Sequence, residues 1–241
     1  MIFHFYLLVQ LMSSGFTFKR FIVSHAKCAM KVGTDGVLLG AWARGGRRIL
    51  DVGTGSGLVA LMMAQRFADA EVTAIDIEPG ACLQARENVA ASPFADRVSV
   101  VEAPLQTFRG GEYDAIVCNP PFYAGTLDSK TAARTMARSA ATLPFADLFS
   151  YAARLLACSG ELSVVIPSAL RREFDTEAAL SGLYPRRACS IRTVPHKPVS
   201  RCLLAYGTSP AMEVEESEEC LNNADMTRSP WYSRLTEEFY L

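Results

Sequence analysis

Strand-like runs and helical patterns alternate along the chain from residue 47 onward, and this alternation constrains the fold more than any other feature. Strands are predicted at 47–53, 71–77, 97–103, 112–119, 161–167, 186–194 and 200–208, and helices at 56–68, 79–90, 144–157 and 168–182. Such alternation is typical of a parallel sheet with helices on both faces. Only a Pro-His-Lys-Pro stretch separates the last two strands, which predicts an antiparallel hairpin at one edge.

The composition argues against several other classes of protein. The 241 residues are 50% hydrophobic and 20% charged, with a mean hydropathy of +0.14, which excludes disordered and collagen-like chains. No apolar run reaches the roughly 18 residues of a membrane helix. The seven cysteines are odd in number and lack C-x-x-C spacing, which predicts a reducing cytoplasm and no disulfide framework. His25 and Cys28 are too few ligands for a metal site, and none is expected.

The two ends of the chain differ from its middle. Residues 1–12 are apolar but lack the positive charge and cleavage site of a signal peptide. We expect residues 1–14 to be an N-terminal extension, with Met12 as a plausible start, followed by one domain over 15–241; an apolar segment packed on that domain is the alternative. Residues 125–205 carry 11 Lys and Arg against 6 Asp and Glu, whereas residues 206–241 carry 2 against 8. The basic middle allows a nucleic-acid surface, and the acidic stretch 212–223 is predicted to be an exposed connector.

A glycine-rich loop joins the first of these strands to its helix. The run from Asp51 reads D-V-G-T-G-S-G, with glycines at Gly53, Gly55 and Gly57. Glycine permits positive φ and lets a ligand approach the backbone, and ligands of open α/β sheets bind at the carboxyl ends of strands. Asp76 ends the next strand, where a carboxylate can accept hydrogen bonds from both ribose hydroxyls of a nucleoside cofactor. The alternative is a turn that only packs strand on helix.

The tetrapeptide Asn119-Pro120-Pro121-Phe122 directly follows the fourth strand. The prolines stiffen the loop and push the preceding residues to extended geometry. The Asn119 side-chain carbonyl and the Pro120 carbonyl can then accept two protons of a planar amine while Phe122 stacks on its face. These two acceptors favour a tetrahedral amino nitrogen whose lone pair attacks a methyl group, so positioning and electrostatics supply the rate. A Pro-Pro turn that only ends a strand is the alternative.

The glycine loop with Asp76 resembles the pattern of class I S-adenosylmethionine methyltransferases, over residues 47–208. The resemblance implies a Rossmann-like α/β fold with a seven-stranded, mostly parallel sheet whose last strand is antiparallel. It implies that Gly53, Gly55 and Gly57 line the methionine part of the cofactor, with Asp51 beneath, and that Asp76 holds the ribose. Pro104 stands where the family usually has an acid that contacts the adenine of the cofactor. Either Glu102 takes that role, or backbone and apolar contacts hold the adenine.

The N-P-P-F motif adds a resemblance to amino-group methyltransferases, which act on adenine N6, guanine N2 or glutamine amides. Residues 15–43, G-F-T-F-K-R-F through K-V-G-T-D-G, narrow the choice because they resemble the bacterial tRNA1(Val) adenine-37 N6-methyltransferase family. The segments 231–236 and 239–241 resemble that family's closing helix, so the resemblance spans 15–241. It implies a valine tRNA as partner and the adenine beside the anticodon as substrate.

Several polar residues are candidates for cofactor or RNA contacts. Thr34 or Asp35 can cap a helix through 36–43, and a cofactor or substrate contact is the alternative for them. Lys19, Arg20, Lys27 and Lys31 interleave with Phe16, Phe18 and Phe21, which suits an unpaired RNA strand, unless the basic residues are solvated and the aromatics face the core. Lys130, Arg134 and Arg138 recur every four residues after the N-P-P-F motif and are candidate phosphate contacts. A second basic group comprises Arg186, Arg187, Arg192, His196, Lys197 and Arg201.

These observations predict a cytoplasmic tRNA adenine-N6 methyltransferase, with a monomer as the default state. The near alternatives are a guanine-N2 methyltransferase of ribosomal RNA and a glutamine-N5 methyltransferase of protein. An NAD-linked oxidoreductase is less favoured because Leu58 stands where the dinucleotide motif has its last glycine. A non-catalytic RNA-binding module remains the fourth alternative.

Overall fold

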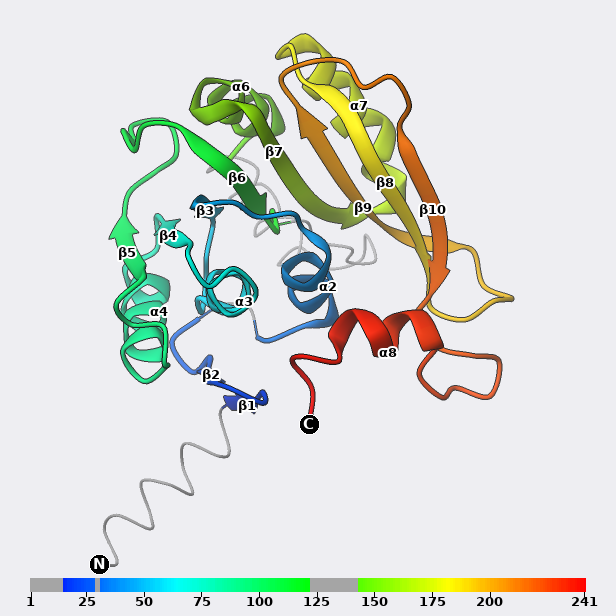
Figure 1. The fold of residues 1–241 in the computed structure, drawn as a ribbon, viewed down its shortest axis with the longest axis horizontal. Helices are drawn as coiled ribbons and strands as arrows, with labels where there is room; N and C mark the ends of the chain where they lie inside the picture. Colours follow the sequence, from blue (N-terminus) through cyan, green and yellow to red (C-terminus); the bar gives the residue numbers. More distant parts are fainter. Residues whose placement is uncertain (1–14, 29–30, 122–142) are drawn as a thin grey trace, which may run out of the picture.

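The computed structural model describes residues 15–28, 31–121 and 143–241. Its centre is one eight-stranded sheet with the strand order β10-β8-β9-β7-β6-β3-β4-β5 (Figure 1). The strands are β3 (Arg48–Val52), β4 (Glu71–Asp76), β5 (Val98–Glu102), β6 (Tyr113–Cys118), β7 (Leu156–Pro167), β8 (Tyr184–Arg192), β9 (Val199–Gly207) and β10 (Glu215–Cys220). β9 runs antiparallel to both of its neighbours, and the other strand pairs are parallel. The expected Rossmann-like fold and its closing hairpin are confirmed.

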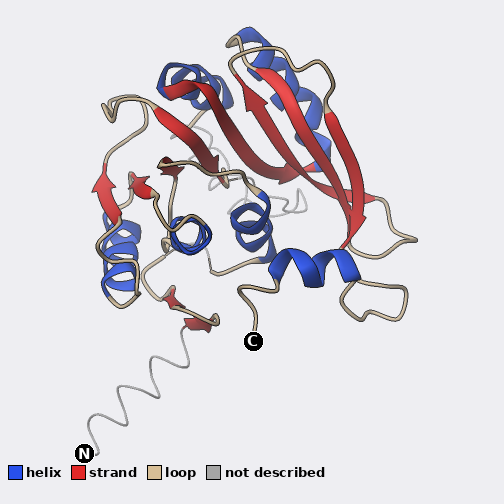
Figure 2. Cartoon of the chain, in the orientation of Figure 1, coloured by secondary structure: helices blue, strands red, loops and turns tan. Residues whose placement is uncertain are grey.

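Helices cover both faces of this sheet (Figure 2). The helices are α2 (Thr34–Trp42), α3 (Leu58–Arg66), α4 (Pro79–Ala90), α6 (Phe145–Leu155), α7 (Arg171–Leu180) and α8 (Pro230–Thr236), and a 3-10 turn, Ser168–Leu170, precedes α7. Alternate residues of β3 enter two separate cores: Ile49 joins the cluster under α2 and α3, and Leu50 joins the cluster under α6 and α7. Parallel strands buried on both faces require such continuous apolar runs. Among the described residues, no helix has the length and apolarity needed to cross a membrane.

The sheet has eight strands where seven were predicted, because the acidic stretch expected to be a connector forms β10. β10 pairs in parallel with β8 at the end of the sheet. Its charges are balanced by arginines, since Glu215 binds Arg44, Glu216 binds Arg171 and Glu218 binds Arg192. Charged side chains also suit an edge strand because they discourage pairing with another chain. The antiparallel strand is therefore not the last one.

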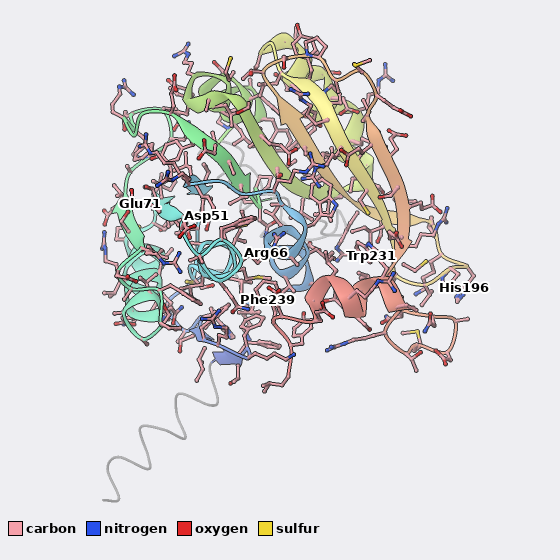
Figure 3. The ribbon with its side chains drawn as sticks, in the orientation of Figure 1. Asp51, Arg66, Glu71, His196, Trp231 and Phe239 are labelled. Atoms are coloured by element: carbon pink, nitrogen blue, oxygen red, sulfur yellow. The ribbon has the colours of Figure 1, made fainter. Side chains whose placement is uncertain are left out.

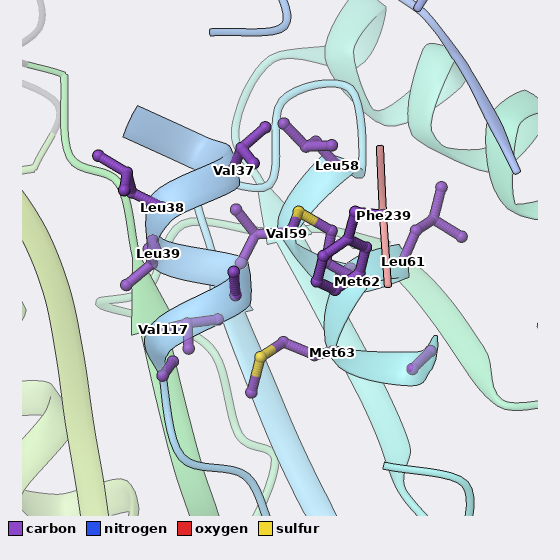
Figure 4. Packing of buried hydrophobic residues seen from close by; sticks show 14 of the residues in the cluster. Val37, Leu38, Leu39, Leu58, Val59, Leu61, Met62, Met63, Val117 and Phe239 are labelled. Atoms are coloured by element: carbon purple, nitrogen blue, oxygen red, sulfur yellow. The ribbon is translucent and has the colours of Figure 1, made fainter. Parts of the chain in front are cut away.

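The N-terminal and C-terminal parts of the described chain meet below α2 and α3. β1 (Gly15–Thr17) and β2 (Ile22–Ser24) form a small antiparallel hairpin, which the sequence did not predict. The Lys19 amide donates to the Phe239 carbonyl at 2.8 Å. Figure 4 shows Phe239 against Leu61 and Met62 of α3, beside the apolar face of α2. This packing holds the segment before α2 in a defined place on the domain.

Candidate active site

Strand register places three predicted site segments in one row. Val52 of β3 is paired with Ile75 of β4 on one side and with Cys118 of β6 on the other. The next residue of each strand is therefore Gly53, Asp76 or Asn119. Neighbouring strands lie about 4.8 Å apart, so the backbones of Asp76 and Asn119 flank the glycine loop at roughly 10 Å from each other. We call this row the cofactor edge.

The cofactor edge lies where the strand order reverses. From β3 the chain proceeds outward to β4 and β5, and then returns to the other side of β3 as β6 and β7. Loops that leave in opposite directions open a crevice at the carboxyl ends of the strands, which is where open α/β sheets bind ligands. The fold thus brings the predicted cofactor residues and the Asn-Pro-Pro segment to one crevice.

The glycine loop, residues 53–57, has a backbone that only glycine adopts readily. The φ angles of Gly53, Gly55 and Gly57 are 69°, 56° and 83°, all in the left-handed region. A Cβ added at Gly53 or Gly55 would meet no atom within 4 Å. The need for glycine there is conformational, and open space lies beside both residues. The Gly53 and Thr54 amides both donate to the Ile75 carbonyl, at 2.9 and 3.0 Å, which ties the loop to β4.

Asp51 lies beneath this loop and is 1% exposed. Its Oδ2 accepts hydrogen bonds from Thr54 Oγ1 at 2.6 Å and from the Ala60 amide at 3.1 Å. Burial raises the pKa of Asp51 to about 7, although both hydrogen bonds oppose the shift. The carboxyl group joins the loop to the first turn of α3, and Figure 3 shows it within the sheet layer.

Asp76 presents a carboxylate that the backbone holds in a fixed orientation. Its Oδ2 accepts from the Gly55 amide at 2.9 Å, and its Oδ1 accepts from the Glu78 amide at 3.0 Å. Each carboxylate oxygen has a second lone pair, so both can still accept a hydrogen bond from a ligand. Glu102 is paired with Asp76 in the β4–β5 register and is exposed at the end of β5. Pro104 is exposed, and its carbonyl accepts from the Thr107 and Phe108 amides, which forms a turn.

The Asn-Pro-Pro segment borders the loop from the opposite side. Asn119 and Pro121 are half-buried and Pro120 is buried. Phe122, Lys130, Arg134 and Arg138 lie outside the described residues. Burial raises the pKa of Cys118, the residue before Asn119, well above its ordinary value, so this thiol stays protonated.

The predicted capping role of Thr34 or Asp35 is wrong. α2 begins at Thr34, two residues earlier than expected, its N-cap is Gly33, and no side chain in the described chain caps it. Asp35 instead forms an ion pair with Arg201 of β9, 166 residues away in sequence. This partner was missed because no local pattern links the two positions. Lys31, which is exposed, and half-buried Thr34 stand at the start of α2.

Lys19 and Arg20 lie far from the cofactor edge. Lys19 Nζ donates to the Glu237 carbonyl at 2.6 Å, and the Arg20 guanidinium lies 5.3 Å from the centre of the Phe94 ring. Phe94 follows the end of α4, whereas Asp76 precedes its start, and a 12-residue helix spans about 18 Å. Phe18 and Phe21 are buried in the core. The structure therefore does not bring these two basic residues together with the rest of the site.

The second basic group, defined above by six residues between 186 and 201, also contains both paired and exposed side chains. Arg187 is buried against Glu161, Arg192 binds Glu218, and Arg186 donates to Ser209. His196 and Lys197 are exposed on the β8–β9 loop, and Figure 3 shows His196 at the periphery, away from Asp51. All seven cysteines are free thiols. The described residues contain no cluster of three or more side chains able to hold a metal ion.

The fold is that of a Rossmann-like methyltransferase. Its mostly parallel sheet reverses strand order at β3, and the glycine loop, the Asp76 carboxylate and the Asn-Pro-Pro segment meet at that point. Residues 32–183 match the family model described as "Methyltransferase small domain". The chain is 44% identical to the tRNA1(Val) (adenine(37)-N6)-methyltransferase of Aeromonas hydrophila, over 95% of this chain and 98% of the relative. It is 42% identical to the protein of that name from Parabacteroides distasonis, over 94% and 97%. The chain belongs to the tRNA1(Val) (adenine(37)-N6)-methyltransferase family.

A solved structure supports the fold independently. A predicted O-methyltransferase from Agrobacterium tumefaciens matches with a TM-score of 0.64 at 20% identity, over 85% of this chain and 96% of that chain. S-adenosylmethionine is the cofactor of this methyltransferase class. The residues at the cofactor edge fit it, because Gly53 and Gly55 leave open space and Asp76 offers two oriented acceptor oxygens.

Proposed function

We propose that this chain methylates the N6 amino group of adenine 37 in the anticodon loop of tRNA1(Val). The observation that carries the proposal is the strand register, which sets Asn119 beside the glycine loop and opposite Asp76. The relatives that match over nearly the whole chain bear the name of this activity. A transfer RNA substrate also favours the cytoplasm as the site of action. We further propose that residues 15–241 act as one domain, because both helical layers share one sheet.

Each residue of the proposed cofactor site has a distinct role. Asp76 binds the ribose hydroxyls with its free lone pairs, while Gly53, Gly55 and Gly57 line the methionine part. We propose that Glu102 contacts the adenine of the cofactor, because in a parallel pair it projects from the same face as Asp76. That role replaces the acid that is missing at Pro104. The cofactor supplies an electrophilic methyl group on a sulfonium.

The Asn-Pro-Pro segment orients the nucleophile. The Asn119 side-chain carbonyl and the Pro120 carbonyl accept the two N6 protons of the target adenine, and Phe122 stacks on the base. The two acceptors free the nitrogen lone pair for attack on the methyl carbon, and N6 then loses one proton to solvent. An adenine in a loop reaches this site at low cost because it is already unpaired. Asn119 and Pro120 therefore act by positioning and electrostatics.

The RNA contacts are proposed for the cofactor-edge side of the molecule. Lys31 is exposed just before α2, whose first turn lies against Leu58 at the start of α3. Lys130, Arg134 and Arg138 follow Asn119 closely in sequence and are proposed to bind phosphates around the target base. Lys19 and Arg20 lie away from the crevice, and we propose that they contact a part of the tRNA outside the anticodon loop. Salt-dependent affinity is expected for all of these contacts.

Methyl transfer from labelled S-adenosylmethionine tests the proposal. We expect N6-methyladenosine in valine tRNA and no label in the same tRNA with guanine at position 37. Label in ribosomal RNA or in protein instead would show that one of the related amino-group activities is correct. Asn119→Ala is expected to abolish transfer while calorimetric binding of S-adenosylmethionine stays within about twofold. A parallel loss of cofactor binding would contradict the role given to Asn119.

A further inference from the structure

α4 carries two buried amide side chains one turn apart on the face that meets the rest of the protein. Gln84 is 3% exposed and Asn88 is 4% exposed. Buried amides are costly unless their hydrogen bonds are made, so their partners indicate what they do. Both amides contact the N-terminal strap, which we define as residues 22–28. Only Asn88 also reaches the glycine loop.

Asn88 uses its full donor capacity to join three segments. Its Nδ2 donates to the Ser24 carbonyl and to the Ser56 carbonyl, each at 2.8 Å. Its Oδ1 accepts from the Ser24 amide at 3.0 Å. An asparagine amide has two N–H donors, and both are engaged here. The side chain therefore fixes α4, the strap and the glycine loop relative to one another.

The orientation of the Ser56 carbonyl depends on hydrogen bonds, because the backbone on either side of it is free to rotate. Ser56 lies between Gly55 and Gly57, whose left-handed backbones have wide conformational freedom. The amide of Gly57, in the same planar peptide unit as the Ser56 carbonyl, donates to the Thr54 carbonyl at 2.9 Å. Asp76 holds Gly55 from the crevice side, and Asn88 holds Ser56 from the α4 side. Together these bonds leave the loop one orientation.

We propose that Asn88 is a positioning residue that sets the glycine loop in its cofactor-binding shape. The inference rests on the proposed binding of S-adenosylmethionine at that loop. A loop that is already ordered loses less conformational freedom when the ligand binds, and therefore binds more tightly. Removing the Asn88 amide frees the Ser56–Gly57 peptide, so the Kd for the cofactor is expected to rise. The chemical step, which Asn119 and Pro120 organise, is affected less.

Gln84 supplies a matched control. Within the described chain its hydrogen bonds go to the Lys27 amide, at 3.2 Å, and to Glu87. Gln84→Ala therefore loosens the strap and removes a buried amide from the same helix face without touching the glycine loop. A purely structural role predicts equal behaviour of the two variants once their stability is matched. A positioning role predicts different cofactor affinities.

The experiment compares Asn88→Ala and Gln84→Ala in the full chain by thermal unfolding and by calorimetric titration with S-adenosylmethionine. Both variants should melt earlier than the wild type. Asn88→Ala should raise the Kd about tenfold at a temperature where it stays folded, with kcat at saturating cofactor within about threefold. Gln84→Ala should leave the Kd within twofold. If Asn88→Ala does not fold, Asn88→Ser, which keeps one donor, should give an intermediate rise in Kd.

Two outcomes would overturn the inference while leaving the proposed function intact. One is an unchanged Kd in the Asn88 variants, and the other is an equal rise in the Gln84 variant. A fall in kcat with no change in Kd is a case of the first outcome and would show that the residue acts on the chemical step. If the wild-type protein binds no S-adenosylmethionine, the proposed function fails first, and the inference falls with it.

Discussion

The two halves of the sheet hold their polar groups in different ways. In the half formed by β3, β4 and β5, carboxylates bind backbone amides and hydroxyls close by in sequence, as Asp51 binds Thr54 three residues away. Around β7 to β10, carboxylates bind arginines, mostly across longer separations: Glu216 of β10 binds Arg171 at 45 residues, and Asp35 of α2 binds Arg201 of β9 at 166. The first half shapes a ligand site with local bonds, and the second uses its cations to secure the sheet.

This difference changes how the basic middle of the chain is interpreted. Its net positive charge suggested an RNA surface, yet Arg171, Arg187 and Arg192 each carry an acidic partner. A paired guanidinium offers little free charge to a phosphate. The exposed residues on the cofactor-edge side are therefore better candidates than the count of arginines implied.

Arg187→Met should strongly destabilise the β7–β10 half. Arg187 and Glu161 are each 8% exposed and paired, and the guanidinium also lies 3.9 Å from the centre of the Trp42 ring. Removing one partner leaves a buried charge, which costs about 3–5 kcal/mol. Urea denaturation should show this loss, and the double variant Arg187→Met with Glu161→Leu should recover much of it. A loss of less than about 1 kcal/mol would show that the pair is not important for stability.

Asp76→Ala should weaken S-adenosylmethionine binding about 10- to 100-fold, because hydrogen bonds to a charged group contribute about 1.5–3 kcal/mol. Asp114→Ala is the matched control. Asp114 of β6 also accepts two backbone amides, from Arg47 at 2.7 Å and Arg48 at 2.9 Å, but at the amino end of β3, the opposite edge of the sheet from Asp76. Calorimetry should find a normal Kd for the Asp114 variant. Equal losses in both variants would mean that Asp76 acts only through loop structure.

Asp51→Asn should remove a pH-dependent part of the stability. Burial raises the pKa of Asp51 to about 7, so the folded state keeps a proton that the unfolded state releases near pH 4. The wild type should therefore lose stability relative to Asp51→Asn as the pH rises from about 4 to 7, by about 4 kcal/mol. Urea denaturation of both proteins from pH 4.5 to 8 measures the difference. A gap that is constant with pH would contradict the raised pKa.

Much of the first half could be predicted from the sequence because its information is local. The boundaries of α4 were predicted as observed, and strands and the glycine loop fell within a residue or two. Motif spacing and strand ends locate Asp51 and Asp76 beside the loop, and their roles toward the cofactor stay predictions. The register that aligns Asp76 with Asn119 follows from the parallel order, which the alternation of strands and helices implied.

The remaining features depend on partners that are distant in sequence. β10 looked like an exposed connector because its glutamates have no apolar alternation. Its pairing with β8 and its ion pairs with three arginines distant in sequence appear only in the folded structure. Asp35 looked like a helix cap because its ion-pair partner, Arg201, is 166 residues away in sequence and cannot be identified from local patterns. Asn88 carried a weak signal, a polar amide among alanines and valine on a helix, but its link to Ser56 requires the packed structure.

Glu216→Gln should give the smallest effect and tests the contrast most directly. The exposed pair with Arg171 contributes only about 0–1 kcal/mol, so stability should change little. Arg171 Nε also lies 3.6 Å from Asp175, so Glu216→Gln removes only one of its two acidic partners. If pairing is what keeps this arginine from binding phosphate, tRNA affinity should rise at most two- to threefold at low salt, with a steeper salt dependence. Glu213→Gln makes the same charge change at an exposed glutamate that has no ion pair among the described residues. Equal gains from both variants would mean that overall charge, and not the pairing of individual arginines, governs RNA binding in this half.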